Sequence, residues 1–385
     1  QLITGNVTLE INTKFYKIVV VDGIGVRSIE KPSVGKYTYS ATYKGTDKIS
    51  RAVDTGVFEV LPVDYNVILN APDVKMIYHD GTRFTATLTD KKGNPIRDAA
   101  IEITINGRSY DKITDEKGSV SLGLNLDSGI YSVVVKFKGL PNYTPITKHA
   151  NVTIEPTVKG LDVVKMFRNS TQYYAIFTDS QGNFLKNKNV QFNINGVFYT
   201  KTTNDKGIAM MGINLNPGKY VITVINIVTG EQSSNIITVK SLIVQKDLTK
   251  YYLNASRFEA TIYNKDGSLA VNKEVTFNIN GVFYHRTTDS NGVASLGISL
   301  RPGEYIITTM FDGLAIGNKV SVLPTLVTKN LNMKYLDGSS FTAQTLDGQG
   351  KPLANQNVSF NVNGVFYYKV TDNNGMAKLN IRLMP

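Results

Sequence analysis

The strongest constraint on the fold of this chain is a short segment that recurs at nearly constant spacing. FNINGVFY runs from Phe192 to Tyr199 and returns unchanged at Phe277–Tyr284. A near copy, FNVNGVFY, spans Phe360–Tyr367, and looser copies contain Asn12 and Asn106. From Asn106 onward, the Asn-Gly pairs follow one another at steps of 89, 85 and 83 residues. A repeat of this length matches a small domain and is too long for one turn of a solenoid.

Each copy has the pattern of a β-hairpin. Asn-Gly between two alternating runs is the strongest short signal for a type I′ turn, which needs positive φ at both central residues. The run RFTATLTD, upstream in the same unit, places Phe84, Ala86 and Leu88 on one face, with a period of two. Further turns recur in fixed order, as in TNDKG and NPGKY, and no segment has a helical period. About seven short strands in under 100 residues are typical of an immunoglobulin-like sandwich.

We therefore predict an all-β fold, a tandem array of seven-stranded immunoglobulin-like β-sandwich domains joined by short linkers into an elongated rod. Complete domains are expected at 64–156, 157–240 and 241–324. Residues 1–63 lack the first strands and residues 325–385 lack the last ones, so both are expected to be partial domains. Either the chain is trimmed at both ends, or strands from another molecule complete them. Four tyrosines that follow Gly by two residues predict tyrosine corners, at Tyr37, Tyr131, Tyr220 and Tyr305.

Composition excludes several classes of site. The chain has no Cys, which rules out disulfides and Cys-based metal or catalytic sites, and its three His are scattered. The net charge of +11 is spread along the chain, so no nucleic-acid partner is expected. No apolar run is long enough for membrane insertion. Enzyme, phosphate-loop and EF-hand motifs are absent, and TDSNG and TDNNG are typical of hairpin turns. We expect no enzyme activity, no cofactor and no metal.

NINGVFYTKTTNDKGIAMMGINLNPGKYVITV and its copy in the next repeat resemble a known family. They are similar to the bacterial-type immunoglobulin-like repeats in adhesin-like surface proteins of methanogenic archaea. The resemblance covers nearly the whole chain and rests on the combination of N-G-x-x-Y, T-x-x-x-G and P-G-x-Y. It implies long tandem arrays outside the cell, attached to the wall, with a role in adhesion and no catalytic residues.

An outward-facing aromatic position is the first candidate contact site. In a two-residue hairpin, Phe192, Ile194 and Tyr199 share the face expected to enter the core, so the intervening Phe198 points away from it. The same position recurs in four copies, at Phe15, Phe198, Phe283 and Phe366. Either a longer loop or bulge turns these rings inward, or they pack under a neighbouring segment, or they form a repeated apolar spot for lateral association or glycan stacking.

Two kinds of covalent modification are also candidates. Asn169 and Asn254 begin Asn-x-Ser/Thr segments in expected turns and are candidate N-glycosylation sites. Lysines recur in first strands and asparagines in last strands, which raises the alternative of Lys–Asn isopeptide crosslinks. The candidate pairs are Lys75 with Asn151, Lys165 with Asn235, and Lys250 with Asn318. The acid that such a reaction needs recurs in only some repeats.

We expect an extracellular, cell-surface, adhesin-like protein whose repeats form a stalk that projects or mediates attachment. Its partners would be other cells, cell-wall polymers, surface glycans or copies of itself. One alternative is a structural subunit of an extracellular filament or wall layer, assembled through open end domains. A second alternative is a carbohydrate-binding repeat array.

Overall fold

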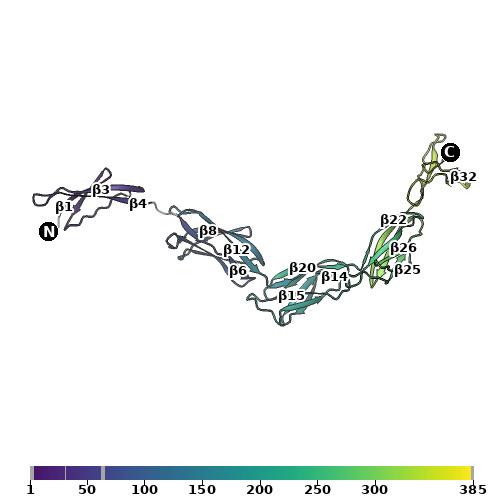
Figure 1. The fold of residues 1–385 in the computed structure, drawn as a ribbon, viewed down its shortest axis with the longest axis horizontal. Helices are drawn as coiled ribbons and strands as arrows, with labels where there is room; N and C mark the ends of the chain where they lie inside the picture. Colours follow the sequence, from purple (N-terminus) through teal and green to yellow (C-terminus); the bar gives the residue numbers. More distant parts are fainter. Residues whose placement is uncertain (1–3, 31, 62–65, 383–385) are drawn as a thin grey trace. The chain divides into compact units, whose positions relative to one another are not determined.

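A computed structural model describes residues 4–30, 32–61 and 66–382 (Figure 1). The described residues form strands and turns, and no helix among them has the length and apolar character to cross a membrane. The chain divides into two compact units, Gln1–Glu155 and Pro156–Pro385, which are taken separately below. The predicted boundary between residues 63 and 64 lies outside the described residues.

The first unit contains one complete sandwich of two sheets. The three-stranded sheet has the order β10-β7-β5, with β5 (Val67–Asn70), β7 (Arg83–Asp90) and β10 (Ser119–Gly123). The five-stranded sheet has the order β6-β12-β11-β8-β9, with β6 (Val74–Ile77), β8 (Ala100–Ile105), β9 (Arg108–Ile113), β11 (Gly129–Phe137) and β12 (Ile146–Glu155). Alternate residues of both sheets fill the core, among them Phe84, Leu88 and Ile103, and all three are buried. The period-two pattern therefore sets which face each strand buries.

Two further sandwiches in the second unit repeat this topology. In one, the sheets are β13-β15-β18 and β14-β20-β19-β16-β17, built from β13 (Val158–Gly160), β14 (Val163–Met166), β15 (Gln172–Phe177), β16 (Asn189–Ile194), β17 (Val197–Thr202), β18 (Ile208–Gly212), β19 (Gly218–Ile225) and β20 (Gln232–Lys240). In the other they are β21-β23-β26 and β22-β28-β27-β24-β25, built from β21 (Ile243–Gln245), β22 (Leu248–Tyr251), β23 (Arg257–Ile262), β24 (Glu274–Ile279), β25 (Val282–Thr287), β26 (Val293–Gly297), β27 (Gly303–Phe311) and β28 (Leu314–Leu323). The protein is thus an all-β chain of consecutive β-sandwich domains.

Each complete sandwich has eight strands, one more than the predicted seven. The first strand divides into two short pieces that join different sheets. In the first sandwich, β5 pairs antiparallel with β7, whereas β6 pairs parallel with β12. The buried positions shift by one residue across the break, from Val67 and Leu69 in β5 to Val74 and Met76 in β6, because the two pieces belong to different sheets.

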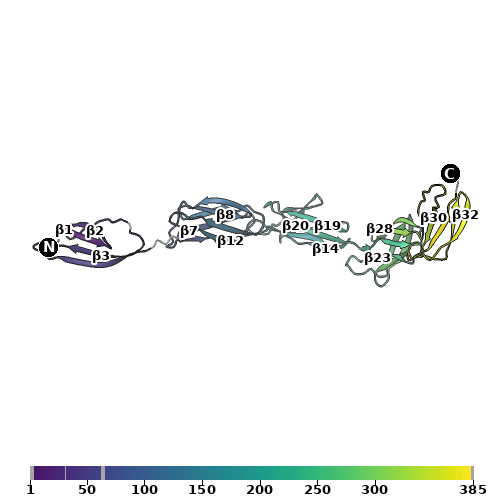
Figure 2. The same cartoon turned by 90° about the horizontal axis from the view of Figure 1, so that it is seen from above.

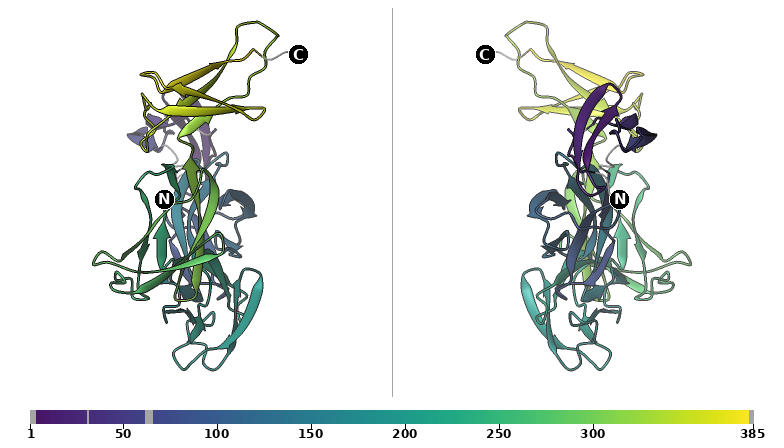
Figure 3. Two further views of the ribbon diagram at one scale, coloured as in Figure 1. Left: turned by 90° about the vertical axis from the view of Figure 1, so that its right-hand side faces the viewer. Right: turned by 90° about the vertical axis from the view of Figure 1, so that its left-hand side faces the viewer.

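The ends of the described chain contain fewer strands than these sandwiches. Residues 4–61 form one four-stranded sheet of order β2-β1-β3-β4, drawn in purple in Figure 2, with β1 (Gly5–Ile11), β2 (Lys14–Val20), β3 (Gly35–Tyr43) and β4 (Ala52–Val60). Residues 326–380 form the sheets β29-β30-β33 and β31-β32, drawn in yellow-green to yellow in Figure 3, with β29 (Leu326–Thr328), β30 (Ser340–Thr345), β31 (Asn357–Val362), β32 (Val365–Val370) and β33 (Met376–Asn380). Within the described residues, the C-terminal part lacks counterparts of β22, β27 and β28.

Two local predictions are confirmed. In the hairpin between β16 and β17, Asn195 has φ 52° and Gly196 has φ 78°, as a type I′ turn requires. The same signs occur at the other Asn-Gly pairs. Each of the four predicted corner tyrosines donates its hydroxyl to a carbonyl oxygen four residues upstream, over 2.6 Å at Tyr37 and 2.8 Å at Tyr131, Tyr220 and Tyr305.

Candidate functional site

The outward phenylalanines lie on strands at a sheet edge. β17, β25 and β32 each end their sheet, and the exposed fractions are 59% for Phe198, 57% for Phe283 and 56% for Phe366. Phe15, on the edge strand β2 of the N-terminal sheet, is 67% exposed. No neighbouring segment covers these rings in the described structure. Their role in contacting a partner stays a prediction.

Each of these rings begins a row of side chains across the outer face of its sheet. Phe198 pairs with Asn193 on β16, which pairs with Thr223 on β19, and Thr223 pairs with Ser234 on β20. The hydroxyls of Thr223 and Ser234 lie 2.9 Å apart. Asn193 Oδ1 accepts a hydrogen bond from Gly196 N at 3.3 Å. The row therefore combines an apolar ring with an amide and two hydroxyl groups on one exposed face.

The same pairing recurs in the next two domains with small changes. Phe283 pairs with Asn278, which pairs with Thr308, and Phe366 pairs with Asn361. The amide of Asn361 is oriented like that of Asn193, because its Oδ1 accepts from Gly364 N at 2.9 Å. A phenylalanine beside an asparagine is thus the shared element of three domains.

The inner face of the hairpin differs from the prediction. Phe192 and Ile194 are buried as expected, but Val197 is 51% exposed and Tyr199 is 41% exposed. Both belong to the edge strand β17, which the facing three-stranded sheet covers only in part. The fifth residue of each of these edge strands is a cation, at Lys112, Lys201, Arg286 and Lys369.

The candidate crosslink partners are not brought together. Lys165 is buried, and its Nζ donates to the backbone oxygens of Ile213 at 2.8 Å and Thr171 at 3.2 Å. In the parallel pairing of β14 with β20, Lys165 lies opposite Val239, four residues and roughly 13 Å from Asn235. Burial lowers the pKa of Lys165, yet its amine has no contact with the asparagine amide. The geometry therefore gives no support for the crosslink.

Lys250 and Asn318 repeat this arrangement. Lys250 Nζ donates to the oxygens of Ile298 at 2.8 Å and Ser256 at 3.3 Å, and burial lowers its pKa as well. Its strand pairing places it opposite Val322, again four residues from Asn318.

Lys75 and Asn151 do not correspond to the lysines and asparagines of the other two pairs, because each lies one residue away from the equivalent position. Lys75 is exposed and forms an ion pair with Glu155, 2.7 Å from Nζ to Oε1. The position of the buried lysines, third in the strand, is Met76 in this domain. The register likewise makes Ala150 the counterpart of Asn235. This domain therefore has neither reacting group in the position where the other two have them.

Asn235 and Asn318 instead belong to a polar cluster that the sequence did not reveal. Asn235 Nδ2 donates to Asp162 Oδ1 at 3.3 Å, and its Oδ1 accepts from Tyr173 Oη at 2.7 Å. Burial, with a smaller contribution from Asp162, raises the pKa of Tyr173 to about 12. In the next domain, Asn318 donates to Asp247 at 2.6 Å and accepts from Gln245 Nε2 at 2.8 Å. The cluster fixes the first strand of each sandwich to its last strand.

The two glycosylation candidates are engaged in hydrogen bonds. Asn169 Nδ2 donates to the backbone oxygen of Lys265 at 2.8 Å, and Asn254 Nδ2 donates to that of Gly348 at 2.5 Å. Both side chains are half-buried. The nitrogen that would carry the sugar thus already has a partner at both sites, and glycosylation there stays a prediction.

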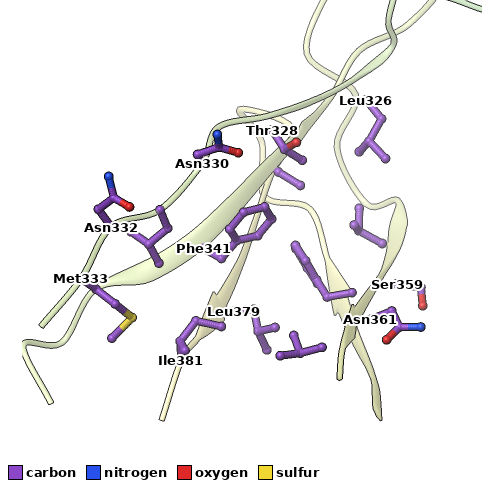
Figure 4. A pocket seen from close by; sticks show the side chains of 15 residues that line it. Leu326, Thr328, Asn330, Asn332, Met333, Phe341, Ser359, Asn361, Leu379 and Ile381 are labelled. Carbon is purple, nitrogen blue, oxygen red and sulfur yellow. The ribbon is translucent and has the colours of Figure 1, made fainter. Parts of the chain in front are cut away.

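A groove of about 710 Å³ lies in the C-terminal part of the second unit (Figure 4). Its walls include Met333, Phe341, Phe360, Leu379 and Ile381, most of them core residues of this domain. In the preceding sandwich, β27 packs beside β24 at the corresponding place. The groove is therefore the uncovered half of a sandwich core rather than a built ligand site.

The acidic turns have the geometry of hairpin turns. Asp289 Oδ1 accepts from Asn291 N at 2.8 Å and from Val293 N at 2.9 Å, and Asp372 repeats both bonds. Across the ranges that the structure describes, no cluster of three His, Cys, Asp or Glu residues is arranged to hold a metal ion.

Comparison with known proteins shows a distant similarity to an adhesin. No protein-family description matches the chain. The inverse autotransporter adhesin YeeJ of Escherichia coli K12 is 21% identical over 392 residues, which cover 84% of this chain. The chain resembles part of a bacterial adhesin. It spans only 16% of the length of that relative, and an archaeal origin stays a prediction.

Two solved structures have low overall similarity to this chain. An ice-binding adhesin of an Antarctic bacterium, described as stabilised by Ca²⁺, has 17% identity and a TM-score of 0.21 over 84% of this chain and 91% of that one. A fragment of titin with three immunoglobulin domains has 12% identity and a TM-score of 0.20 over 67% of this chain and 98% of that one.

Proposed function

We propose that this chain is part of an extracellular, cell-surface, adhesin-like protein, in which the sandwich domains form a stalk. The carrying observation is a tandem array of similar domains whose sequence is related over most of its length to an adhesin. The described residues contain buried apolar cores and turn-forming polar groups, and no three His, Cys, Asp or Glu among them are arranged to hold a metal ion. We propose domains at 64–156, 157–240 and 241–324, with partial domains at 1–63 and 325–385.

Surface location and attachment are tested separately. Antibodies against residues 157–324 should label intact cells, and external protease should remove the label. Deletion of the coding region should reduce attachment to cells or surfaces without a growth defect. Label that appears only after cell lysis contradicts the location, and unchanged attachment contradicts the adhesive role.

The outer sheet face favours a second candidate function, carbohydrate binding. Phe198 offers an apolar ring for stacking against a sugar, while Asn193 and Thr223 offer hydrogen-bonding groups in the same row. A glycan array probed with the full chain should show saturable binding to a defined glycan class. Equal, weak signal on all glycans would contradict this candidate. No contact among the described residues specifically favours the filament alternative.

A further inference from the structure

Asn169 and Asn254 occupy the same place in two successive domains of the second unit. Each follows a residue with positive φ, Arg168 at 58° and Leu253 at 64°, directly after β14 or β22. Asn169 Oδ1 accepts from Thr171 N at 2.8 Å, and Asn254 Oδ1 accepts from Ser256 N, also at 2.8 Å. These bonds fix the side-chain carbonyl inside its own turn and direct the amide nitrogen away from it.

The amide nitrogen of each residue reaches the following domain. The acceptors, Lys265 O and Gly348 O, lie 96 and 94 residues further along the chain. Lys265 lies in the turn after β23, one residue after Asn264. Gly348 lies in the corresponding turn after β30, one residue after Asp347. The same donor therefore meets the same turn position at both joints of the second unit.

Other contacts support each joint in different ways. At the first, Asp312 receives Lys265 Nζ at 2.9 Å, and its backbone oxygen accepts from Arg168 Nη1 at 3.1 Å. At the second, the ring of Tyr251 lies against Gly350, where an added Cβ would be 2.3 Å from Tyr251 Cε2. The asparagine amide is the element that both joints share.

Two other domains, at 64–156 and 325–385, have an aspartate at this position. Asp80 accepts from Ile77 N and Thr82 N with its two oxygens, and Asp337 does the same with Lys334 N and Ser339 N. The turn therefore forms with either residue. Only asparagine keeps a donor available after the turn has formed.

We propose that Asn169 and Asn254 form an interdomain recognition site whose partner is the turn of the next repeat in the same chain. The Asn-x-Ser/Thr pattern at these positions follows from the turn and from this contact, and both amides remain unmodified in the mature protein. Where asparagine is present, the site restrains the joint; aspartate at the same position would release it. This inference is independent of what the protein attaches to.

Distance measurements on the full chain test the restraint. The absence of native Cys allows spin labels at two exposed positions, Lys219→Cys and Thr287→Cys, in adjacent domains. Asn169→Asp should broaden the label-to-label distance distribution and raise the population of released joints roughly fivefold, the change expected for one net hydrogen bond. Asn193→Asp, the same chemical change on the sheet face, should leave the distribution as it is.

Two further readouts make the test decisive. The Asn169→Asp substitution should leave the unfolding midpoint of its own domain unchanged, because Asp80 and Asp337 show that the turn accepts aspartate. Peptide mapping of protein from its native source should find both asparagines without sugar. An unchanged distance distribution in the variant, or a glycan on Asn169 or Asn254, would overturn the proposal.

Discussion

Gly160 lies against the hydroxyl of Tyr173, and a Cβ atom at position 160 would stand 2.0 Å from Tyr173 Oη. In the next domain the corresponding residues are Gln245 and Phe258. In the domain at 157–240, the Tyr173 hydroxyl donates to the side-chain oxygen of Asn235. In the domain at 241–324, the Gln245 amide donates to the side-chain oxygen of Asn318. The two pairs are alternative solutions to one hydrogen-bonding requirement, and neither residue can change alone without cost.

A double-mutant cycle at this pair should show strong coupling. Tyr173→Phe leaves Asn235 Oδ1 without its donor and should lower the free energy of unfolding by about 1–2 kcal/mol. Gly160→Gln alone forces a side chain into the space of the phenol and should cost about 1–3 kcal/mol. The double variant reproduces the arrangement of Gln245 and Phe258 and should recover most of both losses in urea unfolding. Additive losses would contradict this account.

Alkaline pH should destabilise the domain that contains Tyr173. The unfolded phenol ionises near its ordinary pKa of 10.0, whereas burial raises the folded pKa to about 12. The stabilising contribution is therefore complete below pH 10 and is lost as the pH rises toward 12. The full loss would be about 2–3 kcal/mol. Tyr173→Phe should remove this part of the decline when unfolding midpoints are compared between pH 9 and 11.5.

The buried lysine should tolerate replacement by methionine. Met76 occupies the position of Lys165 in another domain, so the side chain fits the site. Lys165→Met removes a desolvated ammonium group but leaves two carbonyls without a donor, and the net change should stay within about 1 kcal/mol. Lys165→Ala also leaves a cavity and should cost about 2–4 kcal/mol.

The pH dependence of stability gives this substitution a second readout. Because burial lowers the folded pKa of Lys165 below 10.5, the stability of the native chain should rise as the pH approaches that value. Lys165→Met should lose its share of this rise. An equal slope in both proteins between pH 8 and 10.5 would show that Lys165 is not desolvated.

Removal of the outward rings should separate function from stability. Replacement of Phe198, Phe283 and Phe366 by Ser should leave the melting temperature nearly unchanged, because all three are more than half exposed. Attachment or glycan binding should fall strongly if these rings carry the contact. Val221→Ser changes another exposed apolar residue of the same sheet and serves as the control. Equal binding by all variants would remove the rings from the contact surface.

Local signals made most of the fold predictable. Asn195 and Gly196 identify their turn because both residue types tolerate positive φ. Tyr220 identifies its tyrosine corner because it follows a glycine by two residues. The predicted crosslink pairs were wrong where residues of the same type occupy different positions in the strand register. Lys75 and Asn151 resemble the residues of later repeats, yet each lies one position away from the core-facing place.

The joint contact could not be predicted because it links residues almost 100 positions apart. Its acceptors, moreover, are backbone oxygens, which no residue type identifies. The exposure of Tyr199 was missed for a related reason. The side of the sheet on which Tyr199 lies was predicted correctly. How far the opposite sheet covers that side is a property of the assembled domain.

The cations on the edge strands have a consequence for the synthesis of the chain. Adjacent domains that share the hairpin sequence FNINGVFY are at risk of exchanging strands while they emerge and fold. Lys201 and Arg286 lie opposite the core residues Val190 and Val275 in their own hairpins. A foreign strand added to this edge would enclose the cation without a partner, at a cost of several kcal/mol. The cations therefore disfavour lateral addition of a neighbour's strand to this edge while near-identical domains fold one after another.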